Sequence, residues 1–157
     1  MIANILVAGS NVFGLCPIMR SYQRQDYITT GAIGFVTGAS FLSHLIENHK
    51  HGMPGLACFG FSTNTSYFLN RLDILGCILV SCRLGYLYLK KHSLSLRPIL
   101  NSKYLLIGSL FALSLNLISE YDKYNINLKG MYIMTHICWH TSIFLIIDKF
   151  LQNIIYQ

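Results

Sequence analysis

Charged residues are scarce in this sequence. Only 11% of its 157 residues are Asp, Glu, Lys or Arg, whereas 53% are hydrophobic. An average soluble domain carries about 25% charged residues. The apolar residues also fall in blocks of about 18 to 20, long enough to cross a bilayer as helices. The composition therefore argues against a soluble protein and predicts an all-α integral membrane protein that forms a single domain over residues 1–157.

Sequence motifs of the common catalytic and metal-binding sites of soluble proteins are also missing. The five cysteines form no CxxC pair, and four of them lie inside apolar runs, where cysteine behaves as a small hydrophobe. We therefore expect neither a disulfide framework nor a structural zinc knuckle. The sequence contains no HExxH, GxSxG, P-loop or glycine-rich dinucleotide motif. No basic segment precedes the first apolar run and no clear cleavage site follows it, so this run is expected to be retained as a helix.

Positive charge is distributed as in a membrane protein. The net charge is +6, but the basic side chains gather at the ends of the apolar runs. No basic stripe interleaved with aromatic residues is present, which argues against a nucleic-acid partner. The partner that the pattern predicts is membrane lipid, and the sequence leaves open whether copies of the chain form a homo-oligomer.

Five transmembrane helices are expected. The first is the weakest because it contains Asn4, Ser10 and Asn11, and Pro17 and Arg20 mark its end. Seven spans would need roughly 140 residues of helix at about 20 each, which leaves almost nothing for the polar loops. The predicted spans are about 2–19, 28–46, 67–89, 103–118 and 131–147.

Small residues recur on one stripe of the second predicted span. They are Gly31, Gly34, Gly38 and Ala39. Small residues at this spacing let helices approach closely in lipid. We interpret the stripe as a face on which another helix packs.

Five spans also fix the sides of the membrane. The N-terminus, the second loop and the fourth loop share one face, and the C-terminus shares the other with the first and third loops. Basic residues concentrate on the second face, which the positive-inside rule makes cytosolic. The sequence thus predicts a lumenal or extracellular N-terminus and a cytosolic C-terminus. The basic residues on the cytosolic face are Arg20, Arg24, Lys90, Lys91, Arg97, Lys103 and Lys149.

Apart from basic residues near the ends of the runs, such as Arg83, four ionisable residues lie inside them: His44, Asp73, His136 and His140. Such side chains are costly in a membrane and are usually functional. Ser40 and His44 are four residues apart, as are His136 and His140, so each pair lies on one side of its helix. The predicted topology places all these residues at similar depth near the non-cytosolic face, which favours one shared site.

Three imidazoles around an open position are the protein ligands of a catalytic zinc ion. Zinc lowers the pKa of a bound water and polarises a carbonyl. A nearby carboxylate such as Asp73 can take the proton of the water, and a hydroxyl such as that of Ser40 can donate to an oxyanion. If the site exists, the ring of His44 lies within about 8 Å of the other two rings.

Structural roles are the alternative for these residues. Each histidine could be a hydrogen-bonded packing residue, and Asp73 could cap its helix or pair with Arg71. The remaining ionisable residues near predicted helix ends are interpreted as solvated or interfacial: His49, His51, His92, Glu47 and Glu120.

The order of these motifs resembles the CREST superfamily, which includes alkaline ceramidases, progestin and adipoQ receptors, lipid-remodelling proteins and myomaker-like proteins. The segments that carry the resemblance are SFLSH from Ser40 to His44, RLDILG around Asp73, and HICWH from His136 to His140. The resemblance implies a Zn²⁺ ion bound by the three histidines, with Asp73 and Ser40 beside it. In ceramidases and adiponectin receptors of this superfamily, the reaction is hydrolysis of a lipid amide.

The chain departs from the family pattern in its number of helices. The family has seven, so this chain would be a shortened CREST-type bundle that lacks a pair of helices between the third and the last. The resemblance predicts a zinc-dependent intramembrane hydrolase of a ceramide-like lipid amide. The alternative is a non-catalytic, myomaker-like membrane protein in which zinc is a structural clamp.

Overall fold

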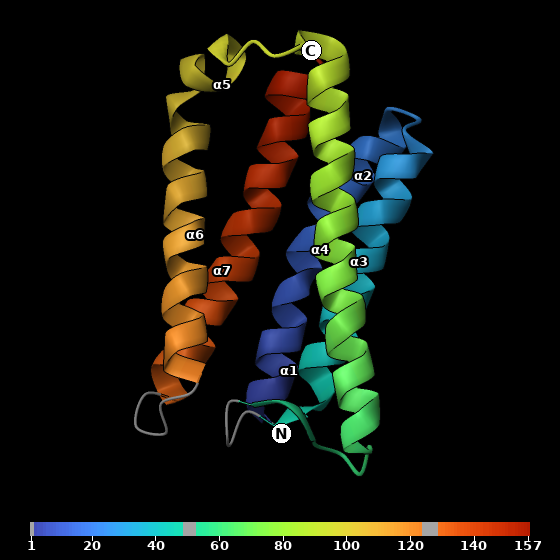
Figure 1. The fold of residues 1–157 in the computed structure, drawn as a ribbon, viewed down its shortest axis with the longest axis vertical. Coiled ribbons are helices and arrows are strands. Elements are labelled where there is room, and N and C mark those ends of the chain that lie inside the picture. Colours follow the sequence, from blue (N-terminus) through green and yellow to red (C-terminus); the bar gives the residue numbers. More distant parts are fainter. Residues whose placement is uncertain (1, 49–52, 124–128) are drawn as a thin grey trace.

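Long helices that run up and down along one axis make up almost the whole molecule (Figure 1). The computed structural model describes residues 2–48, 53–123 and 129–157. An N-terminal rod consists of α1 (Ile2–Gly9), the 3₁₀ segment η1 (Ser10–Gly14) and α2 (Leu15–Gln23). The other elements are α3 (Tyr27–Ile46), α4 (Thr63–His92), the short α5 (Arg97–Asn101), α6 (Lys103–Lys123), α7 (Lys129–Phe150) and the π-helical turn η3 (Leu151–Ile155).

The long helices cover all the predicted spans but are longer than predicted. The N-terminal rod does not end near Met19, as we predicted, but continues through Pro17 to Gln23. Pro17 is in the first turn of α2, where a backbone N–H has no intrahelical partner, so its missing donor costs little. Helix α4 begins at Thr63 because the side chain of Ser62 accepts a hydrogen bond from the backbone N–H of Thr65.

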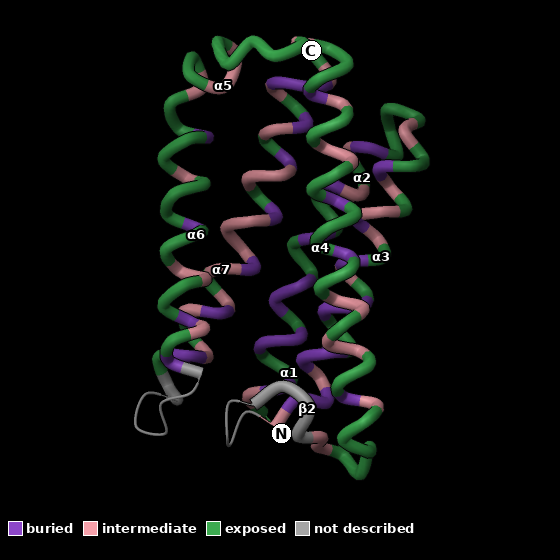
Figure 2. Tube along the Cα trace, in the orientation of Figure 1, coloured by how far each residue is buried: buried purple, intermediate pink, exposed green. Residues whose placement is uncertain are grey.

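Four of the described helices are long and apolar enough to cross a membrane: Ile2–Gln23, Tyr27–Ile46, Thr63–His92 and Lys103–Asp122. The predicted count of five is therefore one too high by this measure. The predicted fifth span lies in α7, which is long enough but carries many polar side chains. It packs against α1, η1, α2 and α6, so much of its surface faces protein (Figure 2).

The loop between α3 and α4 contains a small antiparallel ladder that the all-α prediction did not include. Strand β1 (Glu47–Asn48) pairs with β2 (Met53–Ala57), and Glu47 is opposite Ala57. His49 and His51, which we predicted to be solvated, lie outside the described residues.

The three glycines of the α3 stripe do not pack against another helix within the described residues. A Cβ atom added at Gly31, Gly34 or Gly38 would meet no atom within 4 Å. The close approach is made by Gly76 of α4 instead, where an added Cβ would lie 2.8 Å from the Cα of Val36. Our interpretation of the stripe was therefore wrong for the three glycines within one chain, whereas Ala39 is buried. Gly76 sets the spacing between α3 and α4.

Ion pairs hold the bundle together at the end where α5 lies. Arg20 of α2 donates to Asp148 of α7 at 2.9 Å, and Arg83 of α4 donates to Asp26 at 2.8 Å. Asp26 precedes α3 and accepts a hydrogen bond from the backbone N–H of Thr29 at 3.1 Å. These contacts link α2, α3, α4 and α7 at one end of the bundle. The residues of the predicted site lie towards the opposite end.

Candidate metal centre

Three buried imidazoles meet near the end of the bundle where α3 ends and α7 begins. His44 comes from α3, and His136 and His140 come from successive turns of α7. Their exposed fractions are 4%, 4% and 5%. The ring centroid of His44 lies 4.5 Å from that of His136 and 5.0 Å from that of His140. The ring centroids of His136 and His140 are 4.6 Å apart. The predicted proximity is therefore confirmed for all three residues.

Each imidazole is held at its Nδ1 atom by a different partner. Nδ1 of His44 is 2.9 Å from a carboxylate oxygen of Glu47. Nδ1 of His136 is 2.6 Å from the hydroxyl of Ser119, and Nδ1 of His140 is 2.8 Å from the hydroxyl of Ser10. The partners come from β1 directly after α3, from α6 and from η1, so three elements orient the rings.

The tautomers of two rings follow from these contacts. Ser10 has one hydroxyl proton, which it donates to the carbonyl of Val7 at 2.6 Å. Its oxygen must then accept the Nδ1–H of His140, which leaves the lone pair of that ring on Nε2. The carboxylate of Glu47 likewise accepts the Nδ1–H of His44. Both rings thus present an Nε2 lone pair, the form in which imidazole binds a metal ion.

The spacing of the ligand atoms fits a small cation. The Nε2 atoms of His44 and His136 are 3.1 Å apart. One ligand atom from each of the three histidines lies within 4.8 Å of the others. Tetrahedral zinc with nitrogen bonds of about 2.0–2.1 Å holds pairs of nitrogens about 3.3 Å apart. The pair at 3.1 Å is already close to this distance, so the three residues could hold a metal ion once the remaining ligand atoms, now within 4.8 Å, approach to about 3.3 Å.

Asp73 and Ser40 lie beside the histidines. A carboxylate oxygen of Asp73 is 3.9 Å from Nε2 of His44. Because α4 begins at Thr63, Asp73 lies well inside the helix and cannot cap its start, which removes that alternative. Ser40 is buried one turn before His44 and lines the same cavity as Asp73.

A cavity of about 680 Å³ opens from the cluster between the rod, α3, α4, α6 and α7. Polar side chains surround the histidines, among them Asn11, Asn70, Asn116 and Glu120. Away from them the walls become apolar. We predicted that Glu120 lies at the membrane interface. This half-buried residue also lines the cavity, so the prediction describes only part of its environment.

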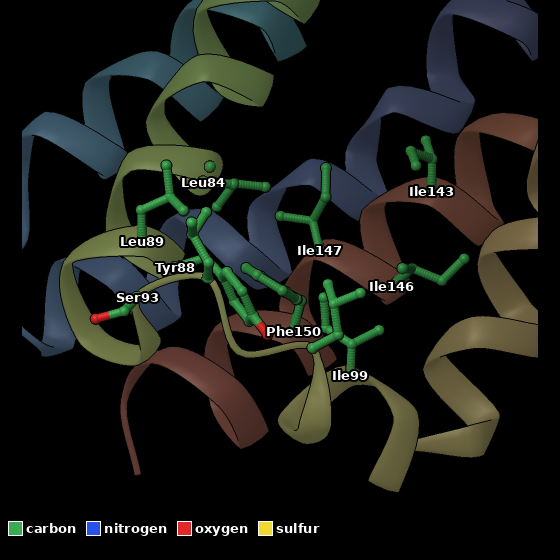
Figure 3. A pocket seen from close by; sticks show the side chains of 12 residues that line it. Leu84, Tyr88, Leu89, Ser93, Ile99, Ile143, Ile146, Ile147 and Phe150 are labelled. Atoms are coloured by element: carbon green, nitrogen blue, oxygen red, sulfur yellow. The ribbon is translucent and has the colours of Figure 1, made fainter.

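A second, almost entirely apolar cavity of about 510 Å³ lies between α4, α5 and α7 (Figure 3). Tyr88 and Phe150 are among the side chains that line it. Leu84, Ile143 and Ile147 line both cavities. The two hollows therefore adjoin, and an apolar path follows α4 and α7 from the histidines towards the α5 end of the bundle.

Several residues of the centre were missed or misread from the sequence. Glu47 is not interfacial, as we predicted, but 2% exposed in contact with His44. Ser10 and Asn4 were interpreted only as residues that weaken the first span. The structure shows Ser10 bound to His140, while the side-chain amide of Asn4 donates to the backbone carbonyl of His44 at 3.1 Å. Polar residues within an apolar run were the signal that could have identified them.

His92, which we predicted to be solvated in a loop, is the half-buried last residue of α4. Its Nε2 donates to the carbonyl oxygen of Ile154 at 2.9 Å. It thus ties α4 to η3 at the opposite end of the molecule.

Comparison with known proteins identifies a full-length relative. Over 153 residues the chain is 52% identical to a protein of Acanthamoeba polyphaga mimivirus described as "Uncharacterized protein L282", and the match covers 98% of this chain and 99% of that protein. No family model matches the chain. No solved structure matches it either.

Proposed function

We propose that this chain, which belongs to one family with the mimivirus protein, is a zinc-dependent hydrolase of lipid amides in a membrane. The proposal rests on the site alone. The observation that carries the proposal is the convergence of His44, His136 and His140, each held at Nδ1 by a separate partner. Histidines that bind a metal through one ring nitrogen typically form a hydrogen bond to another protein group through the other nitrogen.

A location in the membrane is supported by the surface as well as by the four apolar helices. Large apolar side chains cover the outer face of α6, and each of the following is more than half exposed: Ile107, Leu110, Phe111, Leu113 and Leu117. Soluble monomers rarely expose contiguous apolar patches of this kind. In lipid the same side chains are surrounded by hydrocarbon.

Membership in the CREST superfamily is supported by the arrangement of its three motifs. The segments SFLSH, RLDILG and HICWH come from α3, α4 and α7, and they contribute all three histidines, Asp73 and Ser40 to one cavity. The residues that the resemblance implies as zinc ligands are the ones that form the buried cluster. Zinc suits three neutral imidazoles better than magnesium or calcium, which prefer oxygen ligands.

The proposed reaction uses two side chains of this cavity. A bound zinc ion would supply Lewis acidity and a lowered pKa for water. Asp73 accepts a proton from the attacking water as general base and returns it to the leaving nitrogen as general acid. The hydroxyl of Ser40 donates to the oxygen of the carbonyl as negative charge develops on it. The water oxygen bonds to the carbonyl carbon and the C–N bond breaks, which yields a fatty acid and an amine.

The apolar path along α4 and α7 fits the fatty chain of such a substrate. Its walls include Leu84, Ile143 and Ile147, which line both cavities. Because the chain of a membrane lipid leaves hydrocarbon to enter this path, van der Waals packing against the walls, and not the hydrophobic effect, would hold it there. A chain in this path would place its carbonyl group at the histidines.

The test is turnover together with metal content. The purified protein is incubated with ceramide-like amides, and fatty acid release and zinc per chain are measured. We expect one zinc per chain and turnover that falls at least a hundredfold in Asp73→Asn and about tenfold to a hundredfold in Ser40→Ala. Ser43→Ala, a buried serine of the same helix that does not line the cavity, is the matched control. Absence of turnover with zinc bound at one per chain contradicts the hydrolase.

A structural clamp is the second candidate, because the histidines join two parts of the bundle. Helices α3 and α4 pack against each other, as do α6 and α7, and both α3 and α7 pack against the N-terminal rod. A metal ion held by His44 and the two histidines of α7 would link these pairs and stabilise the fold. The clamp is favoured if His44→Ala lowers the unfolding temperature and the wild-type protein shows no turnover.

A further inference from the structure

One polar group in the candidate site has no role in the chemistry described above. Asn11 belongs to η1, directly after Ser10, which holds His140. Its side chain lines the cavity of the histidines, and only 1% of the residue is exposed. Asn11 is therefore a buried amide beside the proposed reaction centre.

The amide of Asn11 is only half satisfied. Its Nδ2 donates to the carbonyl oxygen of Ala8 at 3.2 Å. Its Oδ1 is buried and has no hydrogen-bond partner within the described parts of the chain. The orientation of the amide is fixed by Ala8, since the opposite orientation would place two carbonyl oxygens against each other. A buried acceptor left without a partner costs about 1–3 kcal/mol, which a ligand that donates to it would recover.

The local backbone explains why one acceptor of Asn11 is left without a partner. Ser10 donates to the carbonyl of Val7 and Asn11 donates to that of Ala8, so both side chains bond to the carbonyl three residues earlier. Such bonds accompany the 3₁₀ geometry of η1. This tight segment directs Ser10 to His140 and leaves Asn11, which lines the same cavity as that histidine, with one unpaired acceptor.

We propose that Asn11 is a specificity-determining residue, whose Oδ1 accepts a hydrogen bond from the N–H of the scissile amide. This inference rests on the proposed function and assigns its preference for amides. An ester of the same shape has no N–H and leaves Oδ1 without a partner. A site built to accept a hydrogen bond discriminates against a substrate that lacks the donor. Asn11 thus selects amides over esters, while Asp73 and Ser40 serve both reactions.

A matched pair of substrates tests the proposal. The palmitoyl amide of aminomethylcoumarin and the palmitoyl ester of methylumbelliferone share a chain and a similar leaving group, and neither has a hydroxyl group. In Asn11→Leu we expect kcat/KM for the amide to fall at least tenfold while that for the ester changes less than threefold. Zinc content is expected to remain at one per chain, which shows that the fold and the histidines persist.

The wild-type protein provides a second measurement that needs no variant. The N-methylated coumarin amide lacks the N–H, and we expect at least a tenfold lower kcat/KM for it. An unchanged ratio of amide to ester turnover in a zinc-loaded Asn11→Leu protein overturns the role of Asn11 alone. If that variant does not fold, equal turnover of the methylated and unmethylated amides by the wild type overturns it. A zinc-loaded wild type that hydrolyses neither amide nor ester overturns the proposed function and this inference together.

Discussion

At the scale of single residues, the partners of the imidazoles should control metal affinity. Ser119 contacts Nδ1 of His136 at 2.6 Å, and its loss leaves that ring without this partner. Loss of such a partner typically weakens metal binding by about tenfold to a hundredfold. We expect Ser119→Ala to weaken zinc binding by this amount, as measured by competition with a chromophoric chelator. Ser114→Ala is the matched control, because Ser114 lies on the same helix and donates only to the carbonyl of Leu110. Equal affinities in the two variants would contradict the assigned role.

The residues of the site differ in how far the sequence could predict them. His136 and His140 share a helix face by spacing alone, and an intramembrane histidine is conspicuous in an apolar run. Ser119 could not be found this way, because a serine inside a membrane helix usually donates to its own backbone. Glu47 follows the end of α3, where a charge is expected to face water. The pairing of β1 with β2, the approach of Asn4 and the contact of Tyr132 with Glu47 bury the end of that helix, and none of them can be read from the local sequence.

At the scale of elements, the spacing of α3 and α4 depends on one glycine. A Cβ atom at Gly76 would lie 2.8 Å from backbone and side-chain atoms of Val36, so the helices must separate to accept it. We expect Gly76→Ala to lower the free energy of unfolding by about 1–3 kcal/mol. Gly85→Ala on the same helix meets nothing within 4 Å and should raise it by up to about 1 kcal/mol through helix propensity. Chemical unfolding in detergent micelles measures both, and the idea is wrong if the two changes have the same sign.

The start of α3 provides a prediction that depends on pH. Burial alone raises the pKa of Asp26, but hydrogen bonds from Thr29, Arg83 and Tyr156 outweigh it and lower the pKa below its ordinary value. A carboxyl group with a lowered pKa in the folded state stabilises the protein above its unfolded pKa of about 3.9, and this contribution disappears as the pH falls through the folded pKa. Asp26→Asn should thus cost about 1.5–3 kcal/mol at pH 7.

The cost of Asp26→Asn should then shrink as the pH is lowered below about 4, where the wild-type carboxyl also becomes neutral. Ser62→Ala removes the exposed N-cap of α4 and provides a control, with a cost of about 1 kcal/mol at either pH. Unfolding curves of the three proteins at both pH values decide the matter. A cost of Asp26→Asn that does not change with pH would show that charge is not what Asp26 contributes.

The elements themselves were predictable to different degrees. Apolar length identified every long helix, because a membrane span needs about 20 apolar residues whatever its neighbours are. The polar side chains of α7 are visible in the sequence. The sequence does not show that this helix packs against α1, η1, α2 and α6. The ladder of β1 and β2 and the short α5 are local structures with weak sequence signals, since they depend on contacts with distant helices.

At the scale of the whole molecule, the ends of the helices predict the orientation in the membrane. The N-terminal rod, α3, α4, α6 and α7 alternate in direction, so the two termini lie at opposite ends of the bundle (Figure 1). The end with the C-terminus and α5 also holds the following basic residues, all at helix ends or in the loops between them: Arg20, Arg24, Lys90, Lys91, Arg97, Lys103 and Lys149. Positive charge is usually retained on the cytosolic side, so we predict that this end is cytosolic and that the histidine cluster lies towards the opposite surface.

A glycosylation reporter fused after Gln157 should therefore remain unmodified in a eukaryotic membrane, and the same reporter placed before Met1 should be glycosylated. The loop between α4 and α5 is a second test of the cytosolic side, because Leu94 and Leu96 are exposed there and an inserted tag should be tolerated. Replacing Lys90, Lys91 and Arg97 by Gln removes much of the charge bias and should produce a mixed orientation. A modified C-terminal reporter in the unaltered chain would reverse the assignment and move the candidate site to the cytosolic face.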